Sequence, residues 1–255
     1  MVQSETSRQL KLFTILLSVA MVLLTVAVNT LGQPAYWLDE LFSVVVSLLP
    51  FENLVDELLK DVHPPVYQML LKLWMLAFGD SELATRLMST LFLIGSFVLV
   101  YRQRLMLGAG TVAIYLLLLA SNWVAVYYGM ETRAYAMLLF ASTWASLCFI
   151  QNHRENKAFY QTLIACVFLS LVHFFGLIVS GIMLAYMFFH HLNKPVRIAA
   201  IAAASAMALA WPAVMFLFGD LQAKAGGGSW IESTGPVTAM QFALQSVLPH
   251  VYHPI

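Results

Sequence analysis

Charged side chains are scarce in this sequence: only 10% of its 255 residues are Asp, Glu, Lys or Arg, whereas 61% are hydrophobic. A soluble domain of this size needs a much larger polar surface, so the composition excludes an ordinary soluble protein and predicts a polytopic membrane protein. Cysteine is rarer still, with two residues. Cys148 and Cys166 both lie inside apolar runs, which argues against a disulfide framework.

Other signals are also missing. The sequence has no internal repeat, low-complexity tract or basic run, so we expect no nucleic-acid partner. The histidines show no metal-ligand spacing, and we expect neither a metal site nor a cofactor. The first apolar run lacks a small-residue cleavage pattern, so a cleavable signal peptide is not expected. Residues 223–235 are glycine-rich and are predicted to be flexible.

Hydrophobic runs long enough to approach a bilayer span recur along the chain. A spanning helix needs about 20 apolar residues. Seven segments are candidates, at residues 11–31, 84–101, 111–128, 134–151, 159–175, 176–192 and 196–218. We therefore predict an all-α bundle of about seven transmembrane helices, in which the fifth and sixth helices meet near His173.

Basic residues predict the orientation of this bundle. One set of helix ends carries two acids and eight basic residues, namely Arg8, Lys11, Arg102, Arg104, Arg154, Lys157, Lys194 and Arg197. The other set holds five basic residues against eleven acids. Because short cytoplasmic loops are enriched in Lys and Arg, the N-terminus is predicted to be cytoplasmic and the Asp39 region to lie outside.

The first outer loop, residues 32–83, is predicted to form helices on the membrane surface. Six apolar residues between positions 51 and 62 fall on one helical stripe, and the opposite face is polar. The apolar run 66–78 has only 13 residues, which cover about 20 Å and not the roughly 30 Å of the hydrocarbon core. Lys72 in this run is expected to extend its ammonium group to the surface. We predict three juxtamembrane helices, at residues 38–49, 51–61 and 66–78.

Two acids open this loop. Asp39 and Glu40 follow a helix-ending Gly-Gln-Pro segment and precede an apolar run. Asp39 would be a helix N-cap, with Glu40 in the first turn. It would also suit a general base at the membrane surface, and the two interpretations are compatible because a cap holds a carboxylate rigidly.

Further along, two tight turns carry polar residues. His63 precedes Pro64 and Pro65, which fix its backbone and place it in a turn, where its imidazole is either passive or functional. Glu131 and Arg133 lie between two predicted spans. Either they form a mutual ion pair, or Arg133 grips a phosphate with its planar guanidinium.

Two residues near the predicted outer helix ends have similar alternatives. Arg86 would hold a phosphate or extend its side chain to the surface, and the second is the simpler interpretation. His173 would be a ligand or a hydrogen-bonded core histidine, and we favour the core histidine.

Together these segments resemble a known family. Asp39-Glu40 is followed by His63-Pro64-Pro65-Val66-Tyr67, then by Phe78-Gly79-Asp80-Ser81-Glu82 with Arg86, and then by Met130-Glu131-Thr132-Arg133-Ala134-Tyr135. This order resembles the GT-C glycosyltransferases of the dolichyl-phosphate-mannose–protein mannosyltransferase type, which include bacterial aminoarabinose transferase-like members. The likeness covers roughly residues 30–190. Met130 stands where the family usually has Gln, and Val66 where it usually has Leu.

The resemblance implies a location, a function and roles for individual residues. The chain would be a multi-pass protein of the bacterial inner membrane. The reaction would transfer a sugar from a polyprenyl-phosphate donor to a glycan, lipid or protein acceptor on the outer side, without an essential metal. Asp39 would act as the general base, supported by Glu40. The substrate-binding residues would be Arg133 and Arg86 at the lipid phosphate, Glu131 beside Arg133, His63 at the acceptor-side loop, and Tyr135 at the end of the motif.

Residues 1–255 are expected to form a single transmembrane module of this kind, shorter than its relatives, which continue through several more spans. A non-enzymatic transporter or scaffold is the alternative, as is an inactive fragment of such a transferase. A transporter would carry charged or broken helices at mid-bilayer, whereas the charges here gather at one predicted surface.

Overall fold

The computed structural model describes residues 2–32, 35–61 and 63–218. These residues form helices and contain no β-strand, so the all-α prediction is confirmed for the described part of the chain. The glycine-rich segment predicted to be flexible, residues 223–235, lies outside the described residues.

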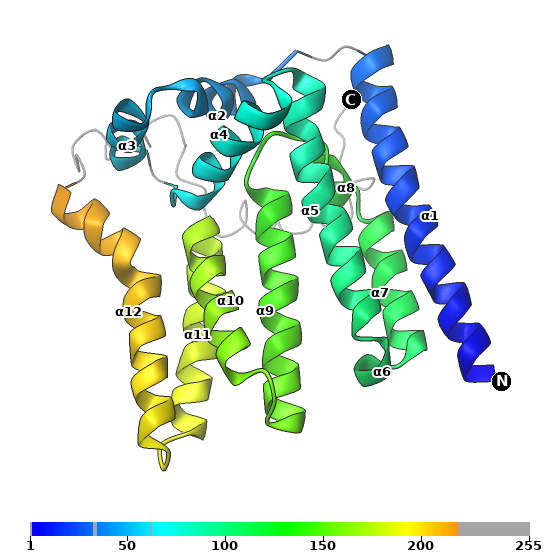
Figure 1. The fold of residues 1–255 in the computed structure, drawn as a ribbon, viewed down its shortest axis with the longest axis vertical. Coiled ribbons are helices and arrows are strands. Elements are labelled where there is room, and N and C mark those ends of the chain that lie inside the picture. Colours follow the sequence, from blue (N-terminus) through cyan, green and yellow to red (C-terminus); the bar gives the residue numbers. More distant parts are fainter. Residues whose placement is uncertain (1, 33–34, 62, 219–255) are drawn as a thin grey trace, which may run out of the picture.

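Long helices stand side by side, and three shorter helices lie across one end of them (Figure 1). The long helices are α1 (Val2–Leu31), α5 (Glu82–Arg102), α7 (Ala109–Ser121), α9 (Tyr135–Glu155), α10 (Phe159–Val172), α11 (Phe174–His190) and α12 (Pro195–Phe218). The crossing helices are α2 (Leu38–Leu48), α3 (Phe51–Lys60) and α4 (Val66–Phe78), which we call the platform. The opposite end, where α1 begins and α11 turns into α12, is the basic end, because Arg8, Arg104, Arg154, Lys194 and Arg197 lie there.

Within the described residues, three helices are long and apolar enough to cross a membrane by length and composition: residues Glu5–Leu31 of α1, then α5 and α12. Helices α7, α10 and α11 are apolar but have 13 to 17 residues. The chain therefore has the character of a membrane protein.

Most predicted helices are found close to their predicted positions, and one is divided. The segment 111–128 was predicted as a single helix, but it forms α7 and a separate short helix, α8 (Trp123–Tyr128). Asn122 stands between them in an extended conformation, and its side-chain oxygen accepts a hydrogen bond from the backbone N–H of Ala125 at 3.0 Å. An Asn in this position starts a new helix, which a hydropathy average does not detect. The break near His173 was predicted, and α10 and α11 meet there.

The platform helices agree with prediction to within one residue at their ends. The prediction for Lys72 was wrong. Its side chain is buried, and its ammonium group donates hydrogen bonds to the backbone carbonyls of Ser47, at 3.1 Å, and of Leu49. Lys72 therefore caps the C-terminal end of α2, where helix carbonyls lack partners and the helix dipole attracts a cation.

Small residues let the central helices approach closely. Ala141 and Ala145 of α9 are buried in one cluster with Ala165 and Leu169 of α10. At the α10–α11 corner, a Cβ added to Gly176 would lie 2.2 Å from the backbone oxygen of Leu169, so only glycine fits there. Close backbone approach through small residues is typical of helices packed within membranes.

Candidate active site

The first turn of α2 lies against the turn between α8 and α9, residues 129–134. Helix α2 begins at Leu38, so Asp39 and Glu40 are both inside its first turn, and Trp37 occupies the cap position. The expectation that Asp39 is the N-cap was therefore wrong. Carboxylates in a first turn are nevertheless favoured by the helix dipole. These two consecutive residues pair with different arginines, Asp39 with Arg133 and Glu40 with Arg86.

Glu40 and Arg86 form a closed ion pair. The carboxylate of Glu40 accepts hydrogen bonds from Nε of Arg86 at 2.9 Å and from Nη2 at 2.6 Å. Nη1 of Arg86 donates to the Asn29 side chain at 2.7 Å, and the backbone N–H of Thr132 donates to Glu40 at 2.8 Å. The two charged residues are 1% and 5% exposed, respectively. This pair connects α1, α2, α5 and the 129–134 turn.

Hydroxyl groups hold the 129–134 turn on α5. Thr90 donates to the backbone oxygen of Gly129 at 2.9 Å, and Ser89 donates to that of Glu131. Thr132 donates to the Thr85 hydroxyl at 2.8 Å. The turn that carries Arg133 is therefore anchored in place by side chains of a long helix.

Asp39 and Arg133 form a looser pair. Nη2 of Arg133 lies 3.7 Å from a carboxylate oxygen of Asp39, beyond hydrogen-bond range, and the Asp39 side chain is 39% exposed. Nη1 of Arg133 donates to the backbone oxygen of Asp39 at 3.2 Å and to the Ser43 hydroxyl at 3.1 Å. Its Nε has no hydrogen-bond partner among the described residues, although it is buried. This guanidinium retains donor capacity next to an accessible carboxylate.

Glu131 forms no ion pair with Arg133 in the described part of the chain. It is 5% exposed, and neither carboxylate oxygen has a hydrogen bond of good geometry from a described residue. Burial raises the pKa of the Glu131 carboxyl, and interaction with the Tyr127 hydroxyl partly offsets that rise. The acidic side chain paired with Arg133 in the described part of the chain is therefore Asp39, not Glu131.

A small cavity lies on the other side of Arg133. It is lined by Arg133, Tyr67, His63, Tyr135 and His173, together with neighbouring residues of the platform, the turn and α10. Its volume is about 10 Å³, which suits one water molecule and not a sugar ring.

Two histidines meet at this cavity. Their rings lie 5.5 Å apart edge to face, and Nδ1 of His63 is 3.1 Å from a carboxylate oxygen of Asp61. Nδ1 of His173 accepts the backbone N–H of Phe175 at 3.2 Å, which caps α11. Burial, with smaller contributions from the charges of His63 and Arg133, lowers the pKa of His173 to about 4. His173 is thus a buried, hydrogen-bonded histidine, which is the interpretation favoured from the sequence.

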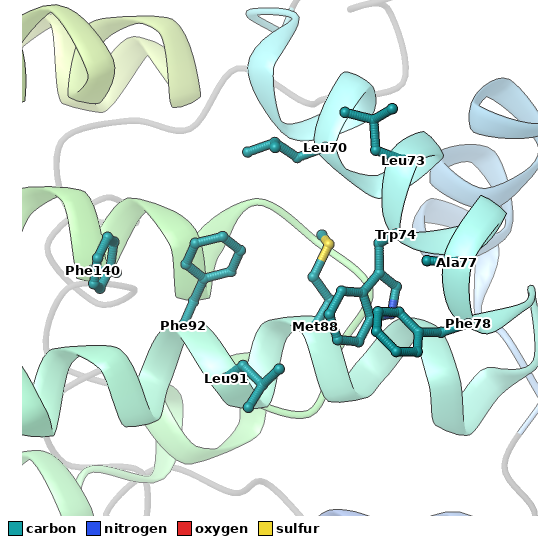
Figure 2. Close-up of a pocket in the computed structure, with 9 residues that line it drawn as sticks. All are labelled: Leu70, Leu73, Trp74, Ala77, Phe78, Met88, Leu91, Phe92 and Phe140. Atoms are coloured by element: carbon teal, nitrogen blue, oxygen red, sulfur yellow. The ribbon is translucent and has the colours of Figure 1, made fainter.

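An apolar groove of about 480 Å³ opens along the same helices (Figure 2). Leu70, Leu73, Trp74, Ala77 and Phe78 of α4 form one wall, and Met88, Leu91 and Phe92 of α5 with Phe140 of α9 form the other. The ring centres of Trp74 and Phe78 lie 4.1 Å apart with the rings tilted, and the Trp74 indole N–H donates to the backbone oxygen of Ala84 at 2.8 Å. Leu70 is one helical turn from Tyr67, so the groove starts close to the polar cavity.

The structure thus brings all seven sequence-predicted site residues to the platform end, but in two groups. Glu40 and Arg86 bind each other, whereas Asp39, Arg133, His63 and Tyr135 gather around the looser pair and the cavity. Glu131 lies in the turn between them. Sequence reasoning missed Ser43 and Tyr67 as neighbours of Arg133. Tyr67 belongs to the His-Pro-Pro motif, which was a signal for it, but Ser43 sits in an apolar run without one.

No group of three or more His, Cys, Asp or Glu side chains within the described ranges has the arrangement to hold a metal ion. Comparisons with known protein families, with curated proteins and with solved structures found no match to this chain. The site is therefore interpreted from its own geometry.

Proposed function

We propose that this chain is a membrane glycosyltransferase module of GT-C type, with about seven transmembrane helices and the platform on the outer side. It would transfer a sugar from a polyprenyl-phosphate donor to an acceptor hydroxyl. The observation that carries the proposal is the looser pair: an accessible carboxylate, Asp39, beside an arginine, Arg133, with spare donors. An acid and a phosphate-binding cation must lie side by side for this reaction.

The proposed chemistry uses both groups. The phosphate of the donor would bind Arg133 and displace Asp39 from it, which frees the carboxylate to act as a base. Asp39 would then take the proton from the acceptor hydroxyl, whose oxygen forms a bond to the anomeric carbon. The bond from that carbon to the phosphate oxygen breaks, and polyprenyl phosphate leaves with its negative charge stabilised by Arg133.

The other residues would support this step. Glu40 and Arg86 would act as positioning residues, because they lock the first turn of α2 onto α5 and the 129–134 turn. His63 and Tyr135 would line the approach to Arg133. The sugar would lie over the exposed side of Asp39, since the cavity beside Arg133 is too small for it. The apolar groove of Figure 2 has the volume and lining to take part of the polyprenyl chain.

The test is a transfer assay with the full chain reconstituted in liposomes and a labelled polyprenyl-phosphate sugar. Asp39→Asn keeps the shape of the side chain but removes the base, so we expect the rate to fall by about 10²- to 10⁴-fold. Because the Asp39–Arg133 pair is loose and partly exposed, the melting temperature of the Asp39→Asn variant should stay close to that of the wild-type protein.

Asp80→Asn is the matched control, since Asp80 is an exposed acid at the same end of the bundle, and it should keep full activity. An undiminished rate for Asp39→Asn would exclude Asp39 as the base. A wild-type chain that binds polyprenyl phosphate but transfers nothing would show an inactive module instead.

A further inference from the structure

A second apolar groove lies between α11 and α12 and shares no lining residue with the groove of Figure 2. Its volume is about 490 Å³, within the range of about 300–1,000 Å³ that is usual for ligand sites. Its floor is made of small residues, Gly181 and Ala185 on α11 and Ala202 and Ser205 on α12. A Cβ added to Gly181 would meet no atom within 4 Å, so the space beside this glycine is open. Side chains of these two helices thus leave a channel on the surface of the bundle.

Cationic side chains stand at one end of this groove. Helices α11 and α12 run side by side and are joined by a short turn at the basic end (Figure 1). Lys194 in that turn is exposed, and Arg197 in the first turn of α12 is half-buried. Arg197 is four residues before Ile201, a groove residue, and therefore lies one turn beyond it on a neighbouring part of the helix surface.

The position of Arg197 is fixed by its contacts. Its guanidinium group makes a 3.1 Å contact with Nε2 of His191, the residue that follows α11, and lies 4.8 Å from the ring centre of Phe159 in α10. These neighbours are neutral or aromatic groups, which orient the guanidinium without neutralising its charge. Lys157, also at this end, is instead paired with Glu155 at 3.1 Å. Between the groove residues Phe189 and Ile201 the chain therefore carries two cations, Lys194 and Arg197, for which the structure shows no acidic partner among the described residues.

From this juxtaposition we propose that the α11–α12 groove binds an anionic phospholipid, with an acyl chain in the groove and the phosphate at Lys194 and Arg197. An acyl chain fits because the lining is apolar and α12 is long and apolar enough to lie in the hydrocarbon layer. An anionic headgroup fits because basic clusters at helix ends between membrane helices attract such lipids. The site is separate from the Asp39–Arg133 pair, so it does not depend on the function proposed above.

The experiment counts lipids bound to the purified full chain by native mass spectrometry, with phosphatidylglycerol and phosphatidylcholine of identical chains as probes. We expect saturable binding of phosphatidylglycerol and binding of phosphatidylcholine that is weaker by about tenfold or more. Gly181→Leu fills the groove and should abolish the preference. Gly110→Leu is the matched control, because a Cβ at Gly110 also meets no atom within 4 Å and α7 lies elsewhere in the bundle.

The charge is tested with Lys194→Gln, which alters an exposed side chain. Circular dichroism and gel filtration check that the variant is folded. Removal of this cation should weaken the binding of phosphatidylglycerol about fivefold, and Lys194→Arg should keep the wild-type affinity. Inorganic phosphate alone should not compete at millimolar concentration. Equal binding of both lipids, or an unchanged preference in Gly181→Leu, would overturn the proposal. So would a Gly181→Leu protein that changes from dimer to monomer with its lipid count intact, since a second copy would then occupy the groove.

Discussion

Asp39 and Glu40 are neighbours in the chain and each faces an arginine, yet the two ion pairs are built differently. Glu40 and Arg86 are almost completely buried and make two hydrogen bonds to each other, with further partners on both sides. Asp39 is 39% exposed and lies 3.7 Å from Arg133, whose Nε has no partner in the described part of the chain. Residue type alone does not distinguish these pairs.

This difference in burial and geometry indicates a different role for each pair. A buried arginine whose donors are already engaged is held too firmly to exchange partners, and breaking such a pair leaves an uncompensated charge. A partly exposed pair with long contacts contributes little to stability and exchanges partners easily. We therefore assign the closed pair to the fold and keep the looser pair as the proposed site of the chemistry.

The largest effect on stability is expected for Glu40→Gln. This change leaves the Arg86 guanidinium buried without its counter-ion, which should lower the free energy of unfolding by about 3–5 kcal/mol. Thermal unfolding in detergent measures the effect, and Glu57→Gln, which alters an exposed ion pair of α3, is the control. A Glu40→Gln protein as stable as the Glu57→Gln protein would remove the distinction between the two pairs.

Lowering the pH should reduce the free energy of unfolding, because the buried His173 resists protonation in the folded chain. Its pKa is about 4 in the folded chain, because burial disfavours the charged imidazole, and about 6.5 when unfolded. Between pH 4 and pH 6.5 the unfolded state therefore binds more protons than the folded state. The contribution of neutral His173 to the free energy of unfolding is complete above pH 6.5 and is lost as pH falls to 4. The loss is roughly 2–4 kcal/mol.

His173→Asn is the variant for this prediction, since Asn can still cap α11 but does not titrate. Melting temperatures at pH 7.5 and pH 4.5 should differ less in the variant than in the wild-type chain. An equal drop in both proteins would show that other groups cause the acid sensitivity.

A third buried cation extends the comparison. Lys72 caps α2 through the backbone oxygens of Ser47 and Leu49. Lys72→Met keeps most of the side-chain volume but leaves these carbonyls without their donor, so we expect a loss of about 1–3 kcal/mol in thermal unfolding measurements. Lys60→Met, at an exposed lysine, should show no measurable change. If both variants unfold alike, Lys72 does not hold the end of α2.

The platform could be predicted from sequence because its helices depend on local patterns. The stripe of apolar residues in 51–61 and the prolines at 64 and 65 act within a few residues, and α2, α3 and α4 begin and end close to where these patterns placed them. The division at Asn122 was missed, since averaged hydropathy does not respond to one capping side chain.

Pairings over long sequence distances could not be predicted. Glu40 and Arg86 are 46 residues apart, and no periodicity connects them. Lys72 was expected at the surface because its acceptors lie 23 and 25 residues earlier and are backbone atoms, which leave no mark in the sequence. The proximity of Asp39 to Arg133 came from the family resemblance, and nothing in composition or spacing required it.

Binding of polyprenyl phosphate to Arg133→Gln tests the central assignment most directly. If the looser pair holds the donor phosphate, this variant should bind polyprenyl phosphate about 10- to 100-fold more weakly than the wild-type chain. Arg104→Gln, at the basic end, should bind it normally. Wild-type affinity in a folded Arg133→Gln protein would contradict the assignment.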